Sequence, residues 1–311
     1  MTTAVLIPIF NDWEAVARLL GMLDPALADS GHSVEAYLID DGSVEVPPEK
    51  PGPAGLTAIS AVRVLRLRRN LGHQRAIAIG LMYLLEKTAF EYVVVMDGDG
   101  EDDPADVPRL LARARKEEGR SVVFAERTRR SESVAFQVLY HLYRWLHLVL
   151  TGLRVRVGNF SVVPRPCLER LGVVSEIWSH YAAAVFKARI PNVSIPTVRA
   201  RRLGGQSKMR FVGLVTHGLT ALSIYGETIG VRLLIVLAAL LLLVIGCGFS
   251  GIWLLSGDVL GWSLLIVAFL ILFVLQALAM AMVFVIFILA GRQGTAFLPI
   301  RDYAHFILSV R

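Results

Sequence analysis

Charged residues are missing from two long stretches of the sequence, one between Arg232 and Asp258 and one between Asp258 and Arg292. Each stretch exceeds the roughly 20 apolar residues that a helix needs to cross a bilayer. Hydrophobic residues make up 55% of the 311 residues and charged residues only 19%, which excludes a disordered chain and argues against a fully soluble enzyme. The chain before Arg232 is long enough for one globular domain with its own core.

Cysteine is nearly absent as well. Cys167 lies in the polar part and Cys247 in the first apolar stretch, so we expect neither a disulfide nor a cysteine metal site. The opening MTTAVLIPIFND lacks the basic start and long apolar region of a signal peptide, so we expect the globular part in the cytoplasm. The formal net charge of +6 comes without a nucleic-acid-binding motif, and therefore favours anionic lipid over nucleic acid as a partner.

The first 130 residues alternate between strand-like and helix-like segments. Runs of β-formers predict strands over Val5–Ile9, Val34–Ile39, Val62–Leu67, Tyr92–Met96 and Ser121–Ala125. Helical spacing of apolar residues predicts helices over Trp13–Leu27, Gln74–Glu86 and Asp106–Glu118. The alternation predicts an α/β fold with a parallel or mixed sheet covered on both faces, and ligands bind such sheets at the carboxyl ends of the strands.

The two apolar stretches predict a transmembrane hairpin. Only Ser256–Asp258 and its neighbours separate them, and this turn carries no Lys or Arg. Arg232 precedes the first helix, and Arg292, Arg301 and Arg311 follow the second. Positive charge at both ends places the two termini in the cytoplasm, and two buried core helices are the weaker interpretation.

Two further segments are amphipathic. Residues 134–150 fit either a helix in the membrane interface or a core helix with a narrow polar stripe, whereas residues 208–225 favour the interfacial helix because the chain must reach the membrane. We therefore divide the chain into an α/β domain over 1–207, a juxtamembrane amphipathic helix over 208–230, two transmembrane helices over 231–291 and a cytoplasmic tail over 292–311.

The strongest chemical signal is VVVMDGDGEDDP over residues 93–104, in which a predicted strand ends in Asp97 and Asp99. Two carboxylates separated by one small residue can converge on Mg²⁺ or Mn²⁺, which take oxygen ligands and complete their shells with substrate phosphates. A second strand, VEAYLIDDGS, ends in Asp40 and Asp41 and can place a carboxylate on a ribose or a uracil edge. Pro8 and Asn11, which we expect to stop the first strand, open a loop at the same edge.

The order of these motifs resembles a known family. A proline-containing first strand is followed by IDDGS at 39–43, NLGHQRAIAIGL at 70–81, DGDGEDDP at 97–104 and RRLGGQSKM at 201–209. This order resembles the inverting family-2 glycosyltransferases with a GT-A fold, and within them the polyprenyl-phosphate glycosyltransferases. Glu101 stands where that group commonly has Gln, and Asp103 where it commonly has Pro.

The resemblance implies a role for each matching residue. The nucleotide sugar would be bound by Pro8, Asn11, Asp40, Asp41, Asp97 and Arg202, and a Mg²⁺ or Mn²⁺ ion by Asp97 and Asp99. The reaction and the acceptor phosphate would involve Asp99, Asp102, Arg127, Asn159 and Lys208. His73 and His180 fit no recognisable ligand pattern, and we leave them outside the predicted site.

Asn159 marks a departure, because many relatives have at this place an Asp that is thought to act as the base. Asn159 cannot accept a proton at neutral pH. A phosphate monoester, with a second pKa near 6, is already largely dianionic and needs only to be oriented. Alternatively, the acceptor is a hydroxyl group and Asp102 or Glu101 is the base. The first explanation fits a membrane protein better.

The resemblance thus implies inverting transfer of a hexose from a UDP- or GDP-sugar to polyprenyl phosphate at the cytoplasmic membrane face, and it also leads us to expect a homo-oligomer. One alternative is a glycosyltransferase with a hydroxyl acceptor, such as a polysaccharide synthase. Processive synthases carry a Q-x-x-R-W motif, and YHLYRW at 140–145 contains the Arg-Trp pair but lacks the glutamine at the required place. The other is a non-catalytic membrane protein that binds nucleotide sugar or lipid.

Overall fold

The computed structural model describes residues 2–28, 31, 33–49, 51–127, 145, 147–152, 157–204, 220–254, 258–293 and 298–311. The chain divides into two compact units. The first unit comprises residues 1–140, 155–224 and 297–311, and the second comprises residues 141–154 and 225–296.

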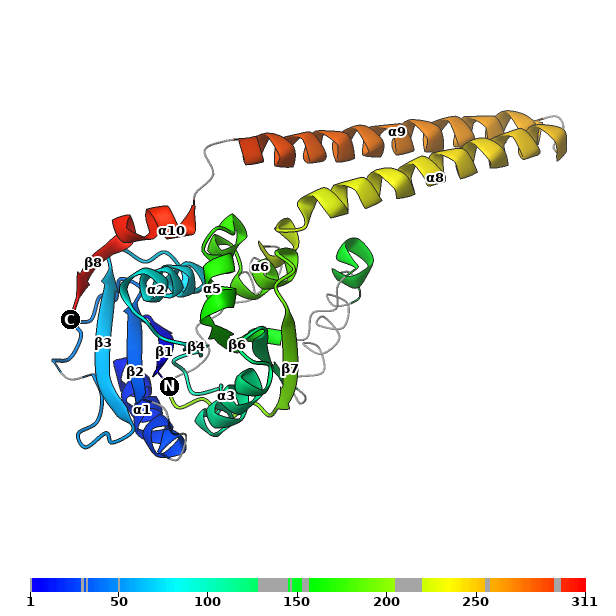
Figure 1. Ribbon diagram of the computed structural model, residues 1–311. Coiled ribbons are helices and arrows are strands. Elements are labelled where there is room, and N and C mark those ends of the chain that lie inside the picture. Colours follow the sequence, from blue (N-terminus) through cyan, green and yellow to red (C-terminus); the bar gives the residue numbers. More distant parts are fainter. Residues whose placement is uncertain are drawn as a thin grey trace. The chain divides into compact units, whose positions relative to one another are not determined.

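A mixed sheet forms the centre of the first unit (Figure 1). Its described strands are β1 (Thr2–Ile9), β2 (Ser33–Asp40), β3 (Ile59–Leu67), β4 (Tyr92–Val95), β5 (Val122–Arg127), β6 (Val157–Pro164), β7 (Asn192–Thr197) and β8 (Ile307–Val310). They lie in the order β7-β5-β6-β4-β1-β2-β3-β8. β1 is parallel to β2 and β4, whereas β6 is antiparallel to both of its neighbours, β4 and β5. The predicted mixed α/β sheet is confirmed.

Helices cover both faces of the sheet, as predicted (Figure 1). One face carries α2 (His73–Lys87), α5 (Arg165–Leu171) and α6 (Tyr181–Lys187), and the other carries α1 (Trp13–Leu27) and α3 (Val107–Lys116). Successive side chains of a strand point to opposite faces, so Leu6 of β1 joins the core under α2 and Ile7 joins the core under α1. α2 lies very close to the sheet, because a Cβ at Gly80 would lie 2.7 Å from Cδ1 of Leu6.

Pro8 lies inside β1 and does not stop it, which differs from our expectation. The carbonyl of Leu6 accepts a hydrogen bond from the N–H of Met96, so the backbone groups at Leu6 face β4. Backbone groups two residues further along a strand face the same side, but β4 ends at Val95, opposite Leu6. The missing N–H of Pro8 therefore costs the sheet no hydrogen bond.

The end of the chain belongs to the sheet, although the sequence led us to expect a separate tail over 292–311. α10 (Pro299–Asp302) is followed by a short 3₁₀ helix, Tyr303–Phe306, and by β8, which pairs antiparallel with β3. The Tyr303 side chain is buried, and its hydroxyl donates to Oε2 of Glu86 on α2 at 2.7 Å. These contacts join residues far apart in the sequence, so local patterning does not reveal them.

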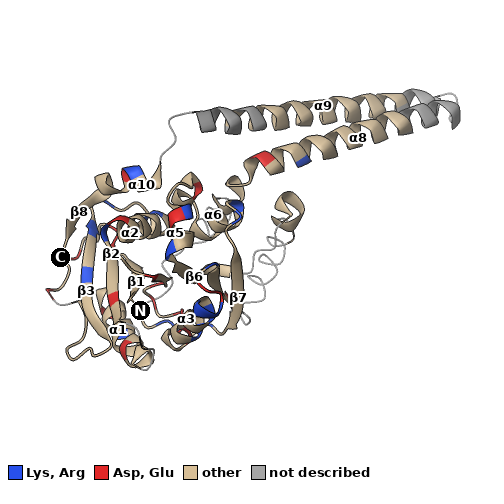
Figure 2. Ribbon diagram, in the orientation of Figure 1, with Lys and Arg blue, Asp and Glu red and all other residues tan. Residues whose placement is uncertain are grey.

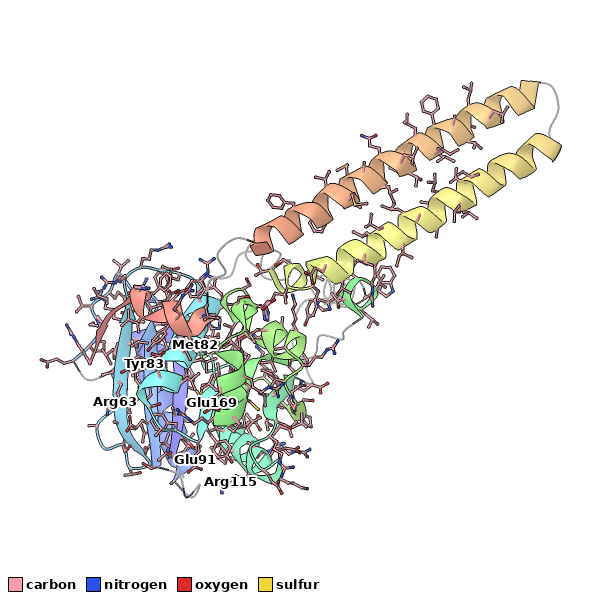
Figure 3. The ribbon with its side chains drawn as sticks, turned by 45° about the horizontal axis from the view of Figure 1, so that its top comes forward. Arg63, Met82, Tyr83, Glu91, Arg115 and Glu169 are labelled. Carbon is pink, nitrogen blue, oxygen red and sulfur yellow. The ribbon has the colours of Figure 1, made fainter. Side chains whose placement is uncertain are left out.

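The second unit contains the two long apolar helices, α8 (Gly226–Leu254) and α9 (Asp258–Gln293), which run side by side (Figure 1). The windows Gly226–Gly246 and Leu264–Phe284 have mean hydropathies of 2.8 and 2.9, and each is only 11% buried. Core helices would be mostly buried, so the two helices are candidate membrane spans. Figure 2 shows the described charges of α8 near its start, and Figure 3 shows apolar side chains projecting along both helices.

The predicted amphipathic segments lie mainly outside the described residues, which omit 128–144 and 205–219. The described end of the first segment is helical over 147–151, and the His147 ring packs edge-on against Tyr225 at 6.1 Å. Arg232 donates from Nη1 to the carbonyl of Val149 at 2.8 Å. Residues 226–230, which we assigned to the juxtamembrane helix, belong to α8.

Candidate active site

The loops that follow β1 and β2 are tied together at the carboxyl edge of the sheet. Asn11 adopts a left-handed conformation with φ of 52°, which Asn tolerates better than most residues. Its backbone N–H donates to Oγ of Ser43 at 2.9 Å, and its Oδ1 accepts from the N–H of Val44 at 2.9 Å. A hollow of about 240 Å³ lies beside Asn11 and is also lined by Glu45 and Leu203. Asn11 therefore shapes the edge at which we expected the nucleotide sugar.

Asp40 is fully buried at the end of β2. Its Oδ1 accepts from the N–H of Ser43 at 2.8 Å, and its Oδ2 lies 3.3 Å from Nε of Arg66 on β3. The carboxylate is thus engaged in closing the turn after β2 and in neutralising a neighbouring arginine.

Asp41, also buried, holds the start of α2. Its two carboxylate oxygens accept from the backbone N–H groups of Leu71 at 2.7 Å and Gly72 at 2.8 Å. Burial raises the pKa of Asp41, and the two N–H donors lower it without cancelling the rise. Because Gly72 directly precedes α2, this contact fixes where His73 enters the site.

The acidic loop after β4 is stabilised by its own carboxylates. Asp102 is buried, and its Oδ2 accepts from the N–H of Asp97 at 2.9 Å. Asp99 accepts at Oδ1 from the N–H of Glu101 at 3.0 Å. The loop also packs closely on β1, because a Cβ at Gly98 would lie 3.2 Å from the carbonyl oxygen of Pro8.

A basic segment, residues 199–203, lies against the acidic loop. Nη1 of Arg202 lies 3.4 Å from Oδ2 of Asp99, and Arg199 pairs with Glu101. The N–H of Leu203 donates to the carbonyl of Asp99 at 2.9 Å, so the two segments are also joined through their backbones. Arg202 was predicted to lie in the site, whereas Arg199 was not.

His73 is a site residue that sequence reasoning left out. Its Nε2 lies 3.0 Å from Oδ1 of Asp97 and 3.0 Å from Nδ2 of Asn159. Burial lowers the pKa of His73, but the negative charges of Asp97, Asp102 and Asp99 outweigh this effect and raise it above its ordinary value. The available signal was its position, since His73 directly follows the Gly72 that precedes α2.

Asn159 reaches this cluster because β6 is antiparallel to β4. Val95 pairs with Ser161, so continuing the register by two residues places Asn159 opposite Asp97. Oδ1 of Asn159 accepts from Nε2 of Gln74 at 3.1 Å, and Oε1 of Gln74 accepts from the backbone N–H of Tyr181 at 2.7 Å. The structure thus brings Asn159 beside the acidic loop.

The other predicted residues are not placed at the cluster by any described contact. Arg127 ends β5 opposite Thr197 of β7, and its side chain lies outside the described residues. Lys208 lies outside them altogether. The contacts above therefore bring together Asp97 with Asn159 through His73, and Asp99 with Arg202.

The donor set limits what metal could bind. Within the described ranges, no group of three or more His, Cys, Asp or Glu side chains converges on one point. Asp97 and Asp99 nevertheless supply the oxygen donors that Mg²⁺ and Mn²⁺ prefer, and such ions commonly take only one or two carboxylates and complete their shells with water and phosphate. The residues present fit a cation that is shared with a phosphorylated substrate.

Comparison with known proteins finds relatives that match most of the chain. An undecaprenyl-phosphate 4-deoxy-4-formamido-L-arabinose transferase of Klebsiella pneumoniae is 28% identical over 82% of this chain and 79% of its own length. The same transferase of Salmonella paratyphi B is 27% identical over 73% of this chain and 72% of its own length.

A solved structure shares the fold. The glucosyl-3-phosphoglycerate synthase of Mycobacterium tuberculosis, in complex with Mn²⁺, UDP-glucose and phosphoglyceric acid, covers 74% of this chain and 80% of its own. Its TM-score is 0.51 at 18% sequence identity, which supports the GT-A fold.

The family itself follows from the sequence as a whole. The model of glycosyl transferase family 2 matches residues 4–168, which is more than half of the chain and includes β1 to β4, the acidic loop and β6. As the motifs predicted, this chain belongs to glycosyl transferase family 2.

Proposed function

We propose that the protein transfers a hexose from a UDP- or GDP-sugar to polyprenyl phosphate at the cytoplasmic face of the membrane. The observation that carries the acceptor in this proposal is the match, over most of the chain, to transferases named for undecaprenyl phosphate. The hexose and the UDP or GDP rest on the motif resemblance alone, because those relatives are named for an arabinose, which is a pentose. The two candidate membrane spans support it, because they would hold the protein where such a lipid lies. The absence of Lys and Arg from the short turn between α8 and α9 favours cytoplasmic ends for both helices.

The acidic loop is the proposed donor end of the site. Asp97 and Asp99 would hold Mg²⁺ or Mn²⁺ together with the donor diphosphate, and the bound cation would supply stabilisation of the negative charge on the departing nucleoside diphosphate. Arg202, at 3.4 Å from Asp99, is close enough to contact the same diphosphate. Asn11 and the hollow beside it mark the side of the site on which we place the nucleoside.

Asn159 is the proposed acceptor contact. A phosphate monoester is largely dianionic at neutral pH, so its oxygen attacks without prior loss of a proton. The new bond joins that oxygen to the anomeric carbon, while the bond from the anomeric carbon to the diphosphate breaks and its electron pair leaves with the nucleoside diphosphate. Attack from the opposite face inverts the anomeric configuration. Asn159 would donate N–H groups to the phosphate and thereby orient it.

A turnover screen of the purified protein in nanodiscs tests the proposal. UDP- and GDP-sugars are each paired with undecaprenyl phosphate and with Mg²⁺ or Mn²⁺, and glycolipids are detected by mass spectrometry. We expect one lipid-phosphate-sugar product, which also identifies the donor. Donor consumption that yields a sugar on a hydroxyl acceptor, and none on the lipid phosphate, would overturn the proposal.

The roles in the acidic loop can be checked in the same assay. Asp99→Ala should reduce the rate by at least about a hundredfold, since oriented electrostatic contacts at a leaving group contribute several kcal/mol. It should also weaken Mn²⁺ binding measured by electron paramagnetic resonance in the presence of the nucleoside diphosphate. Asp103→Asn is the matched control, because Asp103 caps the short 3₁₀ helix Pro104–Asp106 by accepting from the N–H of Ala105, and Asn serves equally well as a cap.

A further inference from the structure

The amide of Gln74 can adopt only one orientation. Its Oε1 lies 2.7 Å from the backbone N–H of Tyr181, the first residue of α6. The first N–H groups of a helix have no partner within the helix, so Gln74 caps α6 from the neighbouring helix α2. A backbone N–H can only donate, which requires the Gln74 oxygen, and not its nitrogen, at this place.

The orientation of the Gln74 amide fixes the orientation of the Asn159 amide. With its oxygen directed to Tyr181, Gln74 presents its NH₂ group to Asn159 and donates from Nε2 to Oδ1 at 3.1 Å. The Asn159 oxygen is therefore engaged on the side of α2, and its NH₂ group faces the cluster, with Nδ2 at 3.0 Å from Nε2 of His73. An isolated asparagine could present either end of its amide, but in this chain Gln74 selects the N–H end.

His73 cannot satisfy both of the groups that its Nε2 faces. Nε2 of His73 lies equally close to Asp97 and to Asn159, at 3.0 Å from each. A ring nitrogen either donates or accepts, so it cannot donate to Asp97 and accept from Asn159 at the same time. When it donates to Asp97, the facing N–H of Asn159 is available to an incoming oxygen atom.

We propose that Gln74 is a positioning residue that holds the Asn159 carboxamide with its N–H groups toward the acceptor phosphate. The inference rests on the proposed function, because it takes the acceptor to be a phosphate monoester. Phosphate oxygens accept hydrogen bonds and do not donate them when ionised. A reversed Asn159 amide would direct its oxygen at the dianion and repel it.

Gln74→Glu tests the orientation with little change in shape. One carboxylate oxygen still accepts from Tyr181, but the other now faces Asn159, which must turn its NH₂ group toward Glu and its oxygen toward the acceptor. Charged hydrogen bonds are worth about 1.5–3 kcal/mol, which corresponds to about a tenfold to hundredfold change in binding. We therefore expect the KM for undecaprenyl phosphate to rise about tenfold to a hundredfold, and the KM for the donor to stay within about twofold.

A double-mutant cycle distinguishes positioning from a general structural effect. Gln74→Glu is measured in the native protein and in the Asn159→Ala background. If Gln74 acts through Asn159, its substitution changes the acceptor KM by less than about twofold once Asn159 is Ala. Equal effects in both backgrounds would overturn the inference, since the added charge or a shifted α6 would then explain them.

A second variant covers a failure of Gln74→Glu to fold. Gln74→Met keeps the length of the side chain and removes both hydrogen bonds, so the Asn159 amide loses its fixed orientation. It should raise the acceptor KM at least about threefold, again only when Asn159 is present, and an unchanged KM would refute the inference. If the native protein makes lipid-linked sugar but the effects of the Gln74 and Asn159 substitutions are additive, this inference alone is refuted. If the native protein makes no lipid-linked sugar, the proposed function is refuted and the inference with it.

Discussion

Asp41→Asn separates two roles for the acidic pair after β2. The sequence assigned Asp41 to the nucleoside, but the structure shows both of its carboxylate oxygens accepting from the N–H groups of Leu71 and Gly72. Asparagine keeps one oxygen and places an NH₂ group against the second N–H, which loses its acceptor. We therefore expect the substitution to lower the stability of the protein even without ligand.

The magnitude follows from the buried N–H group. A buried donor without a partner costs about 1–3 kcal/mol, and relief from burying the Asp41 charge offsets part of this cost, so we expect a loss of about 2 kcal/mol. For a unit of 150–250 residues, about 1 kcal/mol shifts Tm by about 2–4 °C, which gives a fall of about 4–8 °C. The kcat should fall too, because the displaced Gly72 precedes His73 and Gln74.

Scanning calorimetry in detergent measures the change in Tm, with and without nucleoside diphosphate, and the turnover assay measures kcat. Glu45→Gln is the matched control, since it removes one negative charge at the same edge from an exposed side chain and should shift Tm by less than about 2 °C. An Asp41→Asn protein with native Tm but without stabilisation by the nucleotide would refute the reasoning. Asp41 would then serve the nucleoside and not the loop.

Two further predictions concern the framework of the site. Burial raises the pKa of Asp24, but the hydrogen bonds that its carboxylate accepts from Ile59, Thr57 and Ala58 lower it by more. The pKa of Asp24 is therefore below its ordinary value of 3.8. The stability that the Asp24 carboxylate contributes is full above about pH 4 and is lost as the pH falls through the lowered pKa. The difference in Tm between the native protein and Asp24→Asn should therefore narrow below about pH 3.8. A difference in Tm that stays constant with pH would contradict this prediction. Gly100 has φ of 80°, and a Cβ there would lie 2.3 Å from Cγ of Leu203, so Gly100→Ala should destabilise by about 2–4 kcal/mol in chemical denaturation and reduce activity. The control Gly55→Ala, at φ of 85° with no atom within 4 Å, should lose only about 1–2 kcal/mol, and equal losses would show that Leu203 is not the cause.

Local chemistry made much of this protein readable from its sequence. The helix over Trp13–Leu27 was predicted with its observed bounds, and the strands ending in Asp40 and before Asp97 lie where runs of β-formers meet acidic turns. The charge-free stretches sufficed to predict the two apolar helices, because a helix of this length without charges is suited to a bilayer and not to water. The motif order sufficed for the family.

Only the tertiary structure decided which of these residues meet. β6 inserts antiparallel between β4 and β5 and thereby carries Asn159 to Asp97, and β8 returns to β3 from beyond the apolar helices. Both pairings join segments that are distant in the sequence. The residue pattern of β6 or β8 does not identify the strand with which it pairs. The same holds for His73 and Gln74, whose residue types are common and whose roles come from contacts. A sequence pattern reports the period and the turn chemistry of a segment, whereas hydrogen bonds between distant segments depend on how the whole chain packs.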